Sequence, residues 1–399
     1  MVRRLTLEDA RQLAFQNNKA LTLARLNVEE KRHATQAARK DYLPKVMGNV
    51  TYFNFNENLG NVVTLQTPNL RGLIPSLSKT VDVSVLNENS SLSTIFVAQP
   101  ITKLIAVNAL TQIARADEGA AQAQLDKGTR DVLSGVTQAY HGLLGAQRIQ
   151  AVLELQVKLL EQLSAVKPVP ELRIGLLEAR QGLLQVRGQA HELMQTLDDL
   201  LDLPPCIVLE LVDPVPPPLS IRCEDEAANI ALAHSPEVRE AEQSIAKAEA
   251  AMKVAKMAYI PDVSVVGGYA NQTAASYIEP NIGYVGVTGS YTFWEWGKKR
   301  DIKRQRELDI ALAHQNVRVV SDKVQVEARK AFDDYEQARE DLRLAGEMVQ
   351  ARKDAENAAT GPAAFQAKAG TAKAELEYMK AEISYRVAHA KLAALVCVD

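Results

Sequence analysis

The chain contains two copies of one sequence pattern, and this duplication constrains its fold more than any other feature. An offset of 217 residues aligns the segment from Leu5 with the segment from Arg222. The aligned pairs are Ala10 with Ala227, Ala14 with Ala231, Ala24 with Ala241, Ala34 with Ala251, Ala38 with Ala255, Tyr42 with Tyr259, Pro44 with Pro261 and Val46 with Val263. Further along, an offset of 192 aligns Ala139-Tyr140 with Ala331-Phe332, so the first copy holds 25 more residues (217 − 192). Such a chain is expected to fold as two similar units.

Each repeat changes from a helical period to a strand period and back. Pro44 and Pro261 follow the first helical pattern of each repeat, and proline disfavours helix in the residue before it. Alternating side chains then predict two strands per repeat, and long stretches rich in Ala, Gln, Glu, Lys and Arg predict a helical hairpin. The expected strands are about 46–56, 80–97, 262–272 and 282–293, and the expected long helices are about 101–166, 172–203, 297–357 and 371–398.

These elements divide the chain into two structural repeats and a linker. Residues 1–203 form the first repeat and 223–399 the second, and the linker 204–222 between them contains six prolines. At about 1.5 Å per residue, a helix of about 60 residues is a rod near 90 Å long. Such rods must pack side by side, as in coiled coils or helical hairpins.

Composition and motifs exclude several classes of protein. The net charge of −3 gives no overall attraction for nucleic acid. The three cysteines have no zinc-binding spacing, the six histidines are scattered, and no catalytic motif is present. We therefore expect no enzyme activity, no metal and no cofactor. No window of 18 apolar residues exists, and the N-terminus has no signal-peptide pattern. We therefore expect either a cytosolic protein or a mature chain whose signal peptide has been removed.

Four strands from one chain cannot close a barrel, because the smallest closed barrels hold about eight strands. In a membrane, an open sheet would also leave unpaired backbone groups at its two edges. If these strands lie in a membrane, the chain must therefore associate with copies of itself.

Several motifs, in a fixed order within the duplicated frame, resemble one family. They are Leu5-Thr6-Leu7-Glu8-Asp9-Ala10 with Asn17-Asn18, the two Tyr-x-Pro pentads, Phe293-Trp294-Glu295-Trp296-Gly297-Lys298-Lys299-Arg300, and the tip segments Arg173-Ile174-Gly175-Leu176 and Ala369-Gly370-Thr371. Over essentially its whole length the chain resembles the TolC family of outer-membrane efflux and secretion ducts. The resemblance implies a mainly α fold with a β-barrel portion. The resemblance also implies a homotrimer, in which three chains with four strands each would form a 12-stranded outer-membrane barrel, continuous with an α-helical barrel in the periplasm.

The resemblance also suggests site residues. Glu375, Glu377 and Lys380 would ring a periplasmic gate, although an ordinary solvated helix face gives the same pattern. The tip residues Arg173, Ile174, Gly175 and Leu176, together with Ala369, Gly370 and Thr371, would dock a periplasmic adaptor, although turn or helix-capping glycines give the same pattern.

Two further sites follow from composition and position. Trp294 and Trp296, with Lys298, Lys299 and Arg300, form an aromatic and basic run that predicts an anchor at the membrane interface, or a solvated helix face. Cys206 and Cys223 flank the linker and would close a disulfide loop in an oxidising periplasm, for a stabilisation of about 3 kcal/mol.

The expected function is that of a passive exit duct in the outer membrane of a Gram-negative bacterium. Its partners would be an adaptor protein, an inner-membrane pump and outer-membrane lipid, in an efflux pump or a type I secretion system. The alternative is a soluble coiled-coil scaffold or adaptor, which explains the long helices but not the matched positions of the two β-hairpins. The exported substrate does not follow from the sequence, since a wide duct selects little.

Overall fold

The computed structural model describes residues 2–57, 59–66, 78–166, 169–204, 208–214, 219–275, 278–359 and 362–396. The chain divides into two compact units, described separately below. A helical unit comprises Met1–Arg32, Ala116–Ile245 and Leu312–Asp399, and a sheet unit comprises His33–Arg115 and Ala246–Ala311. No described helix is both long enough and apolar enough to cross a membrane.

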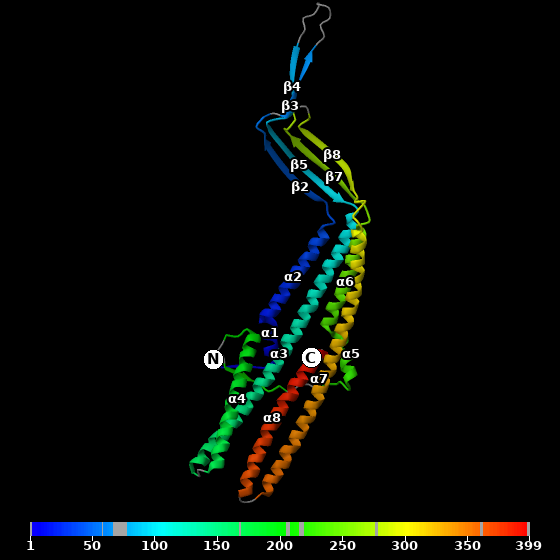
Figure 1. Ribbon diagram of the computed structural model, residues 1–399. Coiled ribbons are helices and arrows are strands. Elements are labelled where there is room, and N and C mark those ends of the chain that lie inside the picture. The colour runs from blue at the N-terminus through cyan, green and yellow to red at the C-terminus, as the bar shows by residue number, and fades with distance from the viewer. Residues whose placement is uncertain are drawn as a thin grey trace, which may run out of the picture. The chain divides into compact units, whose positions relative to one another are not determined.

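Each repeat contributes four helices. In the first repeat they are α1 (Leu7–Asn17), α2 (Lys19–Lys40), α3 (Lys103–Val166) and α4 (Pro170–Leu201), and in the second α5 (Glu224–His234), α6 (Pro236–Met257), α7 (Lys298–Ala358) and α8 (Pro362–Val396). In the helical unit, α4 returns along α3 and α8 returns along α7 (Figure 1). Helix α8 begins nine residues before its expected start at 371 (371 − 362), with a proline at its first position, where the missing N–H has no helical partner to lose.

The first helical pattern of each repeat is interrupted, which the sequence analysis did not predict. Asn18 leaves the helical conformation at ψ 126° and its Oδ1 accepts hydrogen bonds from the N–H groups of Ala20 and Leu21. Ser235, at the same place in the second repeat (18 + 217), has ψ 121° and accepts a hydrogen bond from the N–H of Val238. Both residues therefore cap the following helix, which replaces one expected helix by two.

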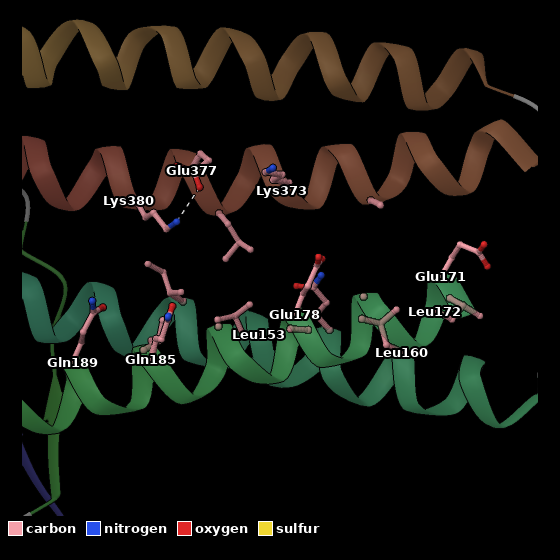
Figure 2. Close-up of a pocket in the computed structure, with 18 of the residues that line it drawn as sticks. Leu153, Leu160, Glu171, Leu172, Glu178, Gln185, Gln189, Lys373, Glu377 and Lys380 are labelled. Atoms are coloured by element: carbon pink, nitrogen blue, oxygen red, sulfur yellow. Dashed lines mark hydrogen bonds and ion pairs between the residues drawn. The ribbon is translucent and has the colours of Figure 1, made fainter. Parts of the chain in front are cut away.

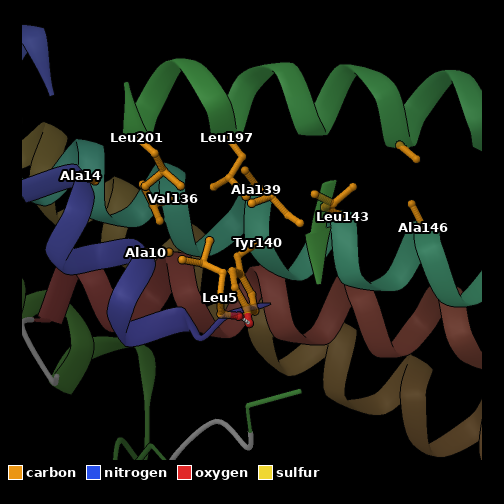
Figure 3. Packing of buried hydrophobic residues seen from close by; sticks show 12 residues of the cluster. Leu5, Ala10, Ala14, Val136, Ala139, Tyr140, Leu143, Ala146, Leu197 and Leu201 are labelled. Atoms are coloured by element: carbon orange, nitrogen blue, oxygen red, sulfur yellow. Dashed lines mark hydrogen bonds between the residues drawn. The ribbon is translucent and has the colours of Figure 1, made fainter. Parts of the chain in front are cut away.

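The two repeats build two equivalent apolar clusters in the helical unit. Leu5, Ala10, Ala139, Tyr140 and Leu197 belong to the first cluster, where side chains of α1, α3 and α4 point toward one another (Figure 3). The second cluster contains the residues that align with three of them, namely Ala227, Ala331 and Phe332, and it also contains Leu392. Small alanines let the helices approach closely while the larger residues fill the remaining space.

A short parallel strand pair that the sequence analysis did not predict covers the first cluster. It consists of β1 (Val2–Leu5) and β6 (Val208–Leu211), and β6 lies within the expected linker. The Tyr140 hydroxyl lies 2.8 Å from the carbonyl oxygen of Leu5 and 2.7 Å from that of Val212, and accepts a hydrogen bond from the N–H of Val212. A buried hydroxyl of α3 thus fixes the N-terminus and the linker at one point.

The sheet unit holds a four-stranded antiparallel sheet to which each repeat gives two strands. The strand order is β2 (Lys45–Asn54), β5 (Asn89–Pro100), β7 (Asp262–Gln272) and β8 (Asn281–Ser290). Pairing of β5 with β7 joins the repeats. The register places Lys45 opposite Ala98, Pro100 opposite Ser264 and Asp262 opposite Ser290. All four connections to helices therefore lie at one end of the sheet.

The expectation of two strands in the first repeat is wrong. The expected strand 80–97 is two strands, β4 (Ser78–Leu86) and β5, because the chain bends at the polar residues Asn87 and Glu88. Strand β4 pairs with β3 (Leu59–Gln66) in a separate two-stranded sheet. Much of this hairpin occupies the additional residues of the first repeat.

Candidate channel-forming surfaces

One face of the four-stranded sheet carries a band of apolar side chains. Alternation along each strand and the register between strands bring these residues to the same face. The band comprises Val46, Val50, Tyr52, Ile95, Val97, Val265, Tyr269, Val285 and Val287, all of them exposed. Val285 is 85% exposed and Val50 is 75% exposed. Exposed apolar surface of this kind marks a site of contact with a membrane or another protein.

The opposite face of the sheet is of mixed character. Asn49, Thr51, Thr94, Ser264 and Thr288 alternate with the apolar band along their strands. Met47, Phe53 and Tyr284 also lie on this second face. The polar residues are compatible with contact with water on this side.

Both outer strands of the sheet have an open edge. Strand β2 pairs only with β5 and strand β8 only with β7 among the described residues. An open edge presents a row of backbone N–H and C=O groups to which another strand can add. The sheet is therefore incomplete in a single chain.

The connection between β8 and α7 brings together the residues predicted as an interface anchor. The rings of Trp294 and Trp296 meet edge to face at 5.8 Å and are 72% and 88% exposed. Lys299 lies over the ring of Tyr291 at 4.5 Å and donates a 2.9 Å hydrogen bond to the carbonyl of Thr292. Lys298 and Arg300 are exposed on the first turn of α7. Trp296 has φ 52°, in the left-handed region that non-glycine residues seldom adopt.

A cavity of about 1200 Å³, called the groove below, lies between the α3–α4 hairpin and α8 in the helical unit. Leu153, Leu160, Leu172 and Leu376 form its apolar part. Polar residues that line it include Glu171, Glu178, Gln185 and Gln189 on α4, and Lys373, Glu377 and Lys380 on α8 (Figure 2). The groove therefore combines an apolar floor with charged and amide side chains.

The three residues predicted for a gate lie on two faces of α8. Glu377 and Lys380 line the groove and form an ion pair at 2.9 Å. Glu375 instead pairs with Lys353 of α7 at 3.0 Å. Within one chain the two carboxylates are thus held in separate ion pairs.

Comparison with known proteins bears on the fold. No protein-family model matches the sequence, and no curated protein matches it. Among solved structures, the outer-membrane channel OprN is similar with a TM-score of 0.78 at 18% identity, over 98% of this chain and 89% of that one. The open state of the MtrE outer membrane channel of Neisseria gonorrhoeae is similar with a TM-score of 0.74 at 15% identity, over 98% and 88%. The outer membrane protein VceC of Vibrio cholerae is similar with a TM-score of 0.71 at 11% identity, over 98% of this chain and 95% of that one.

The chain has the fold of the TolC-like outer-membrane channels. The predicted fold resemblance is thereby confirmed across nearly the whole chain.

Within this TolC-like fold, the two predicted tip segments lie in different settings. Arg173 to Leu176 belong to the first turns of α4, and a Cβ atom added to Gly175 would meet nothing within 4 Å. Gly370 instead lies eight residues into α8 (370 − 362), where an added Cβ would be 3.3 Å from a guanidinium nitrogen of Arg352. Ala369 lines the groove. Thr371 is buried, and its hydroxyl is 3.3 Å from the carbonyl of Arg352 and 3.2 Å from that of Ala367. The second segment therefore lies along a helix and not at the turn itself.

The predicted disulfide stays a prediction. Cys223 is exposed and precedes the first residue of α5. Cys206 lies outside the described residues.

A charged cluster that the sequence did not reveal joins the linker to both helical hairpins. Asp213 accepts hydrogen bonds from Arg148 of α3 and from Arg386 of α8, and Arg386 also pairs with Glu382. The hydrogen bond from Arg386 is the main reason that the pKa of Asp213 is lowered. These residues are up to 238 positions apart (386 − 148), so no local pattern connects them. A single carboxylate placed directly before the prolines of the linker was the only available signal.

His141 lies beside this cluster and is 4% exposed. Burial lowers its pKa to about 4, and the positive charge of Arg386 acts in the same direction. Its Nδ1 atom has no hydrogen-bond partner in the part of the chain that the structure describes. His141 is therefore neutral in the folded protein near pH 7.

No group of three or more His, Cys, Asp and Glu side chains suited to a metal ion occurs among the described residues.

Proposed function

We propose that the chain forms a homotrimeric, non-enzymatic exit duct in the outer membrane of a Gram-negative bacterium. Three copies of the four-stranded sheet would give a closed 12-stranded barrel (3 × 4), and the helical units would form an α-barrel in the periplasm. The duct would serve a tripartite efflux pump or a type I secretion system, in which the pump supplies the energy.

The observation that carries this proposal is an apolar face on a sheet with two open edges. In water, this combination would expose apolar side chains and aggregation-prone strand edges. Closing the sheet with two further copies would pair both edges, and lipid would cover the apolar face. OprN and MtrE, two of the similar solved structures, are outer-membrane channels, which supports the same placement here.

We further propose that the helical ends bind a periplasmic adaptor linked to an inner-membrane pump. The residues assigned to this contact are Arg173, Ile174, Gly175, Leu176, Ala369, Gly370 and Thr371, together with the adjoining groove. Open space around Gly175 supports close approach of a partner helix. A Gly175→Trp variant should lose cross-linking to the adaptor while its trimers persist, and cross-linking at the original level would contradict this assignment.

The first test is the oligomeric mass of the protein extracted from membranes, measured with and without mild detergent. A detergent-dependent trimer that conducts ions in a planar bilayer is the expected result. A monomer or dimer that stays in solution without detergent would contradict the duct and favour the coiled-coil scaffold.

A further inference from the structure

The connections between helices and strands share one end of the four-stranded sheet, as the strand register shows (Figure 1). Three of these connections carry exposed aromatic rings. Tyr42 follows α2, Tyr259 follows α6, and Trp294 and Trp296 precede α7. Tyr42 and Tyr259 are 40% and 46% exposed and are equivalent in the two repeats (42 + 217 = 259). The duplication therefore places the same kind of side chain at the same end of the sheet twice.

Cations accompany the aromatic rings at each of these three connections. Arg39 and Lys256 are equivalent in the two repeats (39 + 217 = 256), and both are exposed. Lys40 and Lys298 are also exposed, and Lys299 is partly exposed. We call these residues the junction collar. Its members are Arg39, Lys40, Tyr42, Lys256, Tyr259, Trp294, Trp296, Lys298 and Lys299.

Three acidic residues lie beside the collar in sequence: Glu295, between Trp294 and Trp296, and Asp41 and Asp262, which are engaged elsewhere. Asp41 pairs with Lys45 at 3.0 Å, and Asp262 pairs with Lys103 at 2.6 Å. Within the described part of the chain, Arg39, Lys40, Lys256 and Lys298 have no acidic partner within ion-pair distance. The five cations of the collar therefore outnumber the one carboxylate among them, Glu295, and four of them carry charge that no ion pair among the described residues neutralises.

We propose that the junction collar binds the headgroups of anionic phospholipids. Aromatic side chains with a polar edge favour the level of the headgroups, and lysine and arginine near an anionic bilayer surface are attracted to its phosphates. The apolar band lies on one face of the sheet, and the collar lies at one end of the same sheet. A lipid whose acyl chains cover the band would therefore have its headgroup at the collar. The inference rests on the proposed membrane placement and adds to it a preference for negatively charged lipid.

The chain offers a direct probe, because Trp294 and Trp296 are its only tryptophans. The full chain is reconstituted into phosphatidylcholine vesicles that contain roughly one quarter phosphatidylglycerol. A spin label near the headgroup is carried in turn by either lipid at the same mole fraction. Quenching of tryptophan emission by labelled phosphatidylglycerol should be about fivefold more effective than quenching by labelled phosphatidylcholine. The preference should weaken as salt is added, since salt screens exposed charges.

The test variant combines Arg39→Gln, Lys40→Gln, Lys256→Gln and Lys298→Gln. It should lose the preference, because these side chains carry the unneutralised charge. A matched control combines Lys158→Gln, Arg318→Gln, Lys323→Gln and Lys330→Gln, four exposed cations of α3 and α7 in the helical unit. The control should keep the preference at the same change in net charge.

The outcomes separate this inference from the proposed function. Equal quenching by the two labelled lipids in the original protein would overturn the proposed binding of anionic lipid at the collar, but it would leave the proposed membrane duct intact. A preference that survives in the test variant, or that does not depend on salt, would also overturn it. No quenching by either lipid would contradict the membrane placement itself. The salt titration uses the unaltered protein, so the inference stays testable even if the variant folds poorly.

Discussion

Single polar residues in the helical unit hold together segments that are distant in the sequence. The Tyr140 hydroxyl joins α3 to both the N-terminal strand and the linker, and Asp213 joins the linker to two hairpins. The Tyr140 hydroxyl is buried, and a buried polar atom that loses its partner is costly.

Removing the Tyr140 hydroxyl tests the first of these contacts. The variant Tyr140→Phe keeps the ring but leaves the Val212 N–H and two carbonyl oxygens without this partner. We expect a loss of about 1–3 kcal/mol in the free energy of unfolding. Denaturation followed by circular dichroism measures it. The variant Tyr378→Phe, which changes a tyrosine on the exposed side of α8, is the control and should unfold like the original protein.

His141 predicts a dependence of stability on pH. Its pKa is about 4 in the folded protein and about 6.5 when unfolded, so the unfolded chain binds more protons between these values. Its contribution is therefore complete above pH 6.5 and is lost as pH falls toward 4, by up to about 3 kcal/mol. Arg386, Asp213 and His389 are the charged or titratable groups that act on it.

The variant His141→Gln should flatten the stability profile in that pH range. Unfolding midpoints in urea between pH 7 and 4 (roughly the range set by the two pKa values) measure the effect. The exposed His314 provides the control variant His314→Gln, which should retain the acid sensitivity of the original protein. An unchanged profile in His141→Gln would show that other groups cause the sensitivity.

At the scale of elements, the sequence predicted those features that repeat or that obey a local rule. The duplicated Tyr-x-Pro pentads predicted where helices end, and the long Ala-rich stretches predicted helical hairpins. The break at Asn18 and Ser235 was missed, although alignment of two capping residues at the 217 offset was available as a signal. The β1–β6 pair could not be predicted, because its stability depends on Tyr140, which is distant from both strands in the sequence.

The break between α1 and α2 predicts a cost for losing its cap. Asn18 is 6% exposed, caps α2 and donates a 3.0 Å hydrogen bond to the carbonyl of Leu200. The variant Asn18→Ala should lower the free energy of unfolding by about 2 kcal/mol. The variant Asn316→Ala, at an exposed position within α7, should leave it unchanged or slightly higher because alanine favours helix. Thermal unfolding of the two variants side by side decides between these expectations.

At the scale of the whole molecule, the two faces of the sheet have to meet different surroundings. Ile95 belongs to the apolar band and is 63% exposed, whereas Thr94, the preceding residue, lies on the opposite face. The two faces of the sheet could not be predicted from the sequence as the helices were, since a face is defined only when the register of all four strands is known.

Placing an arginine at these two neighbouring positions tests the proposed lipid face. The variant Ile95→Arg should reduce the yield of folded trimer in membranes, corresponding to a cost of about 2–4 kcal/mol if the position lies near the bilayer centre. The variant Thr94→Arg should be tolerated because its side chain would face the lumen. Equal yields of the two variants would contradict the assignment of the faces.

The proposed gate is a property of the trimer. Symmetry would bring three copies of Glu377 together, where mutual repulsion and attraction of cations would set ion flow. The variant Glu377→Gln should change the single-channel conductance, whereas the variant Glu192→Gln, at an exposed position of α4, should not. A conductance equal to that of the original protein would remove Glu377 from the gate.

The pairing of β5 with β7 has a consequence for biosynthesis. The paired residues are 164 to 180 positions apart (264 − 100 and 272 − 92), so the centre of the sheet forms only by closing a very long loop. Until the second repeat has been synthesised, strand β5 has no neighbour on its outer side. Its unpaired backbone groups must then be kept from pairing with other nascent chains. Folding of the sheet is therefore expected to be slow and dependent on chaperones, whereas the local helical hairpins form early.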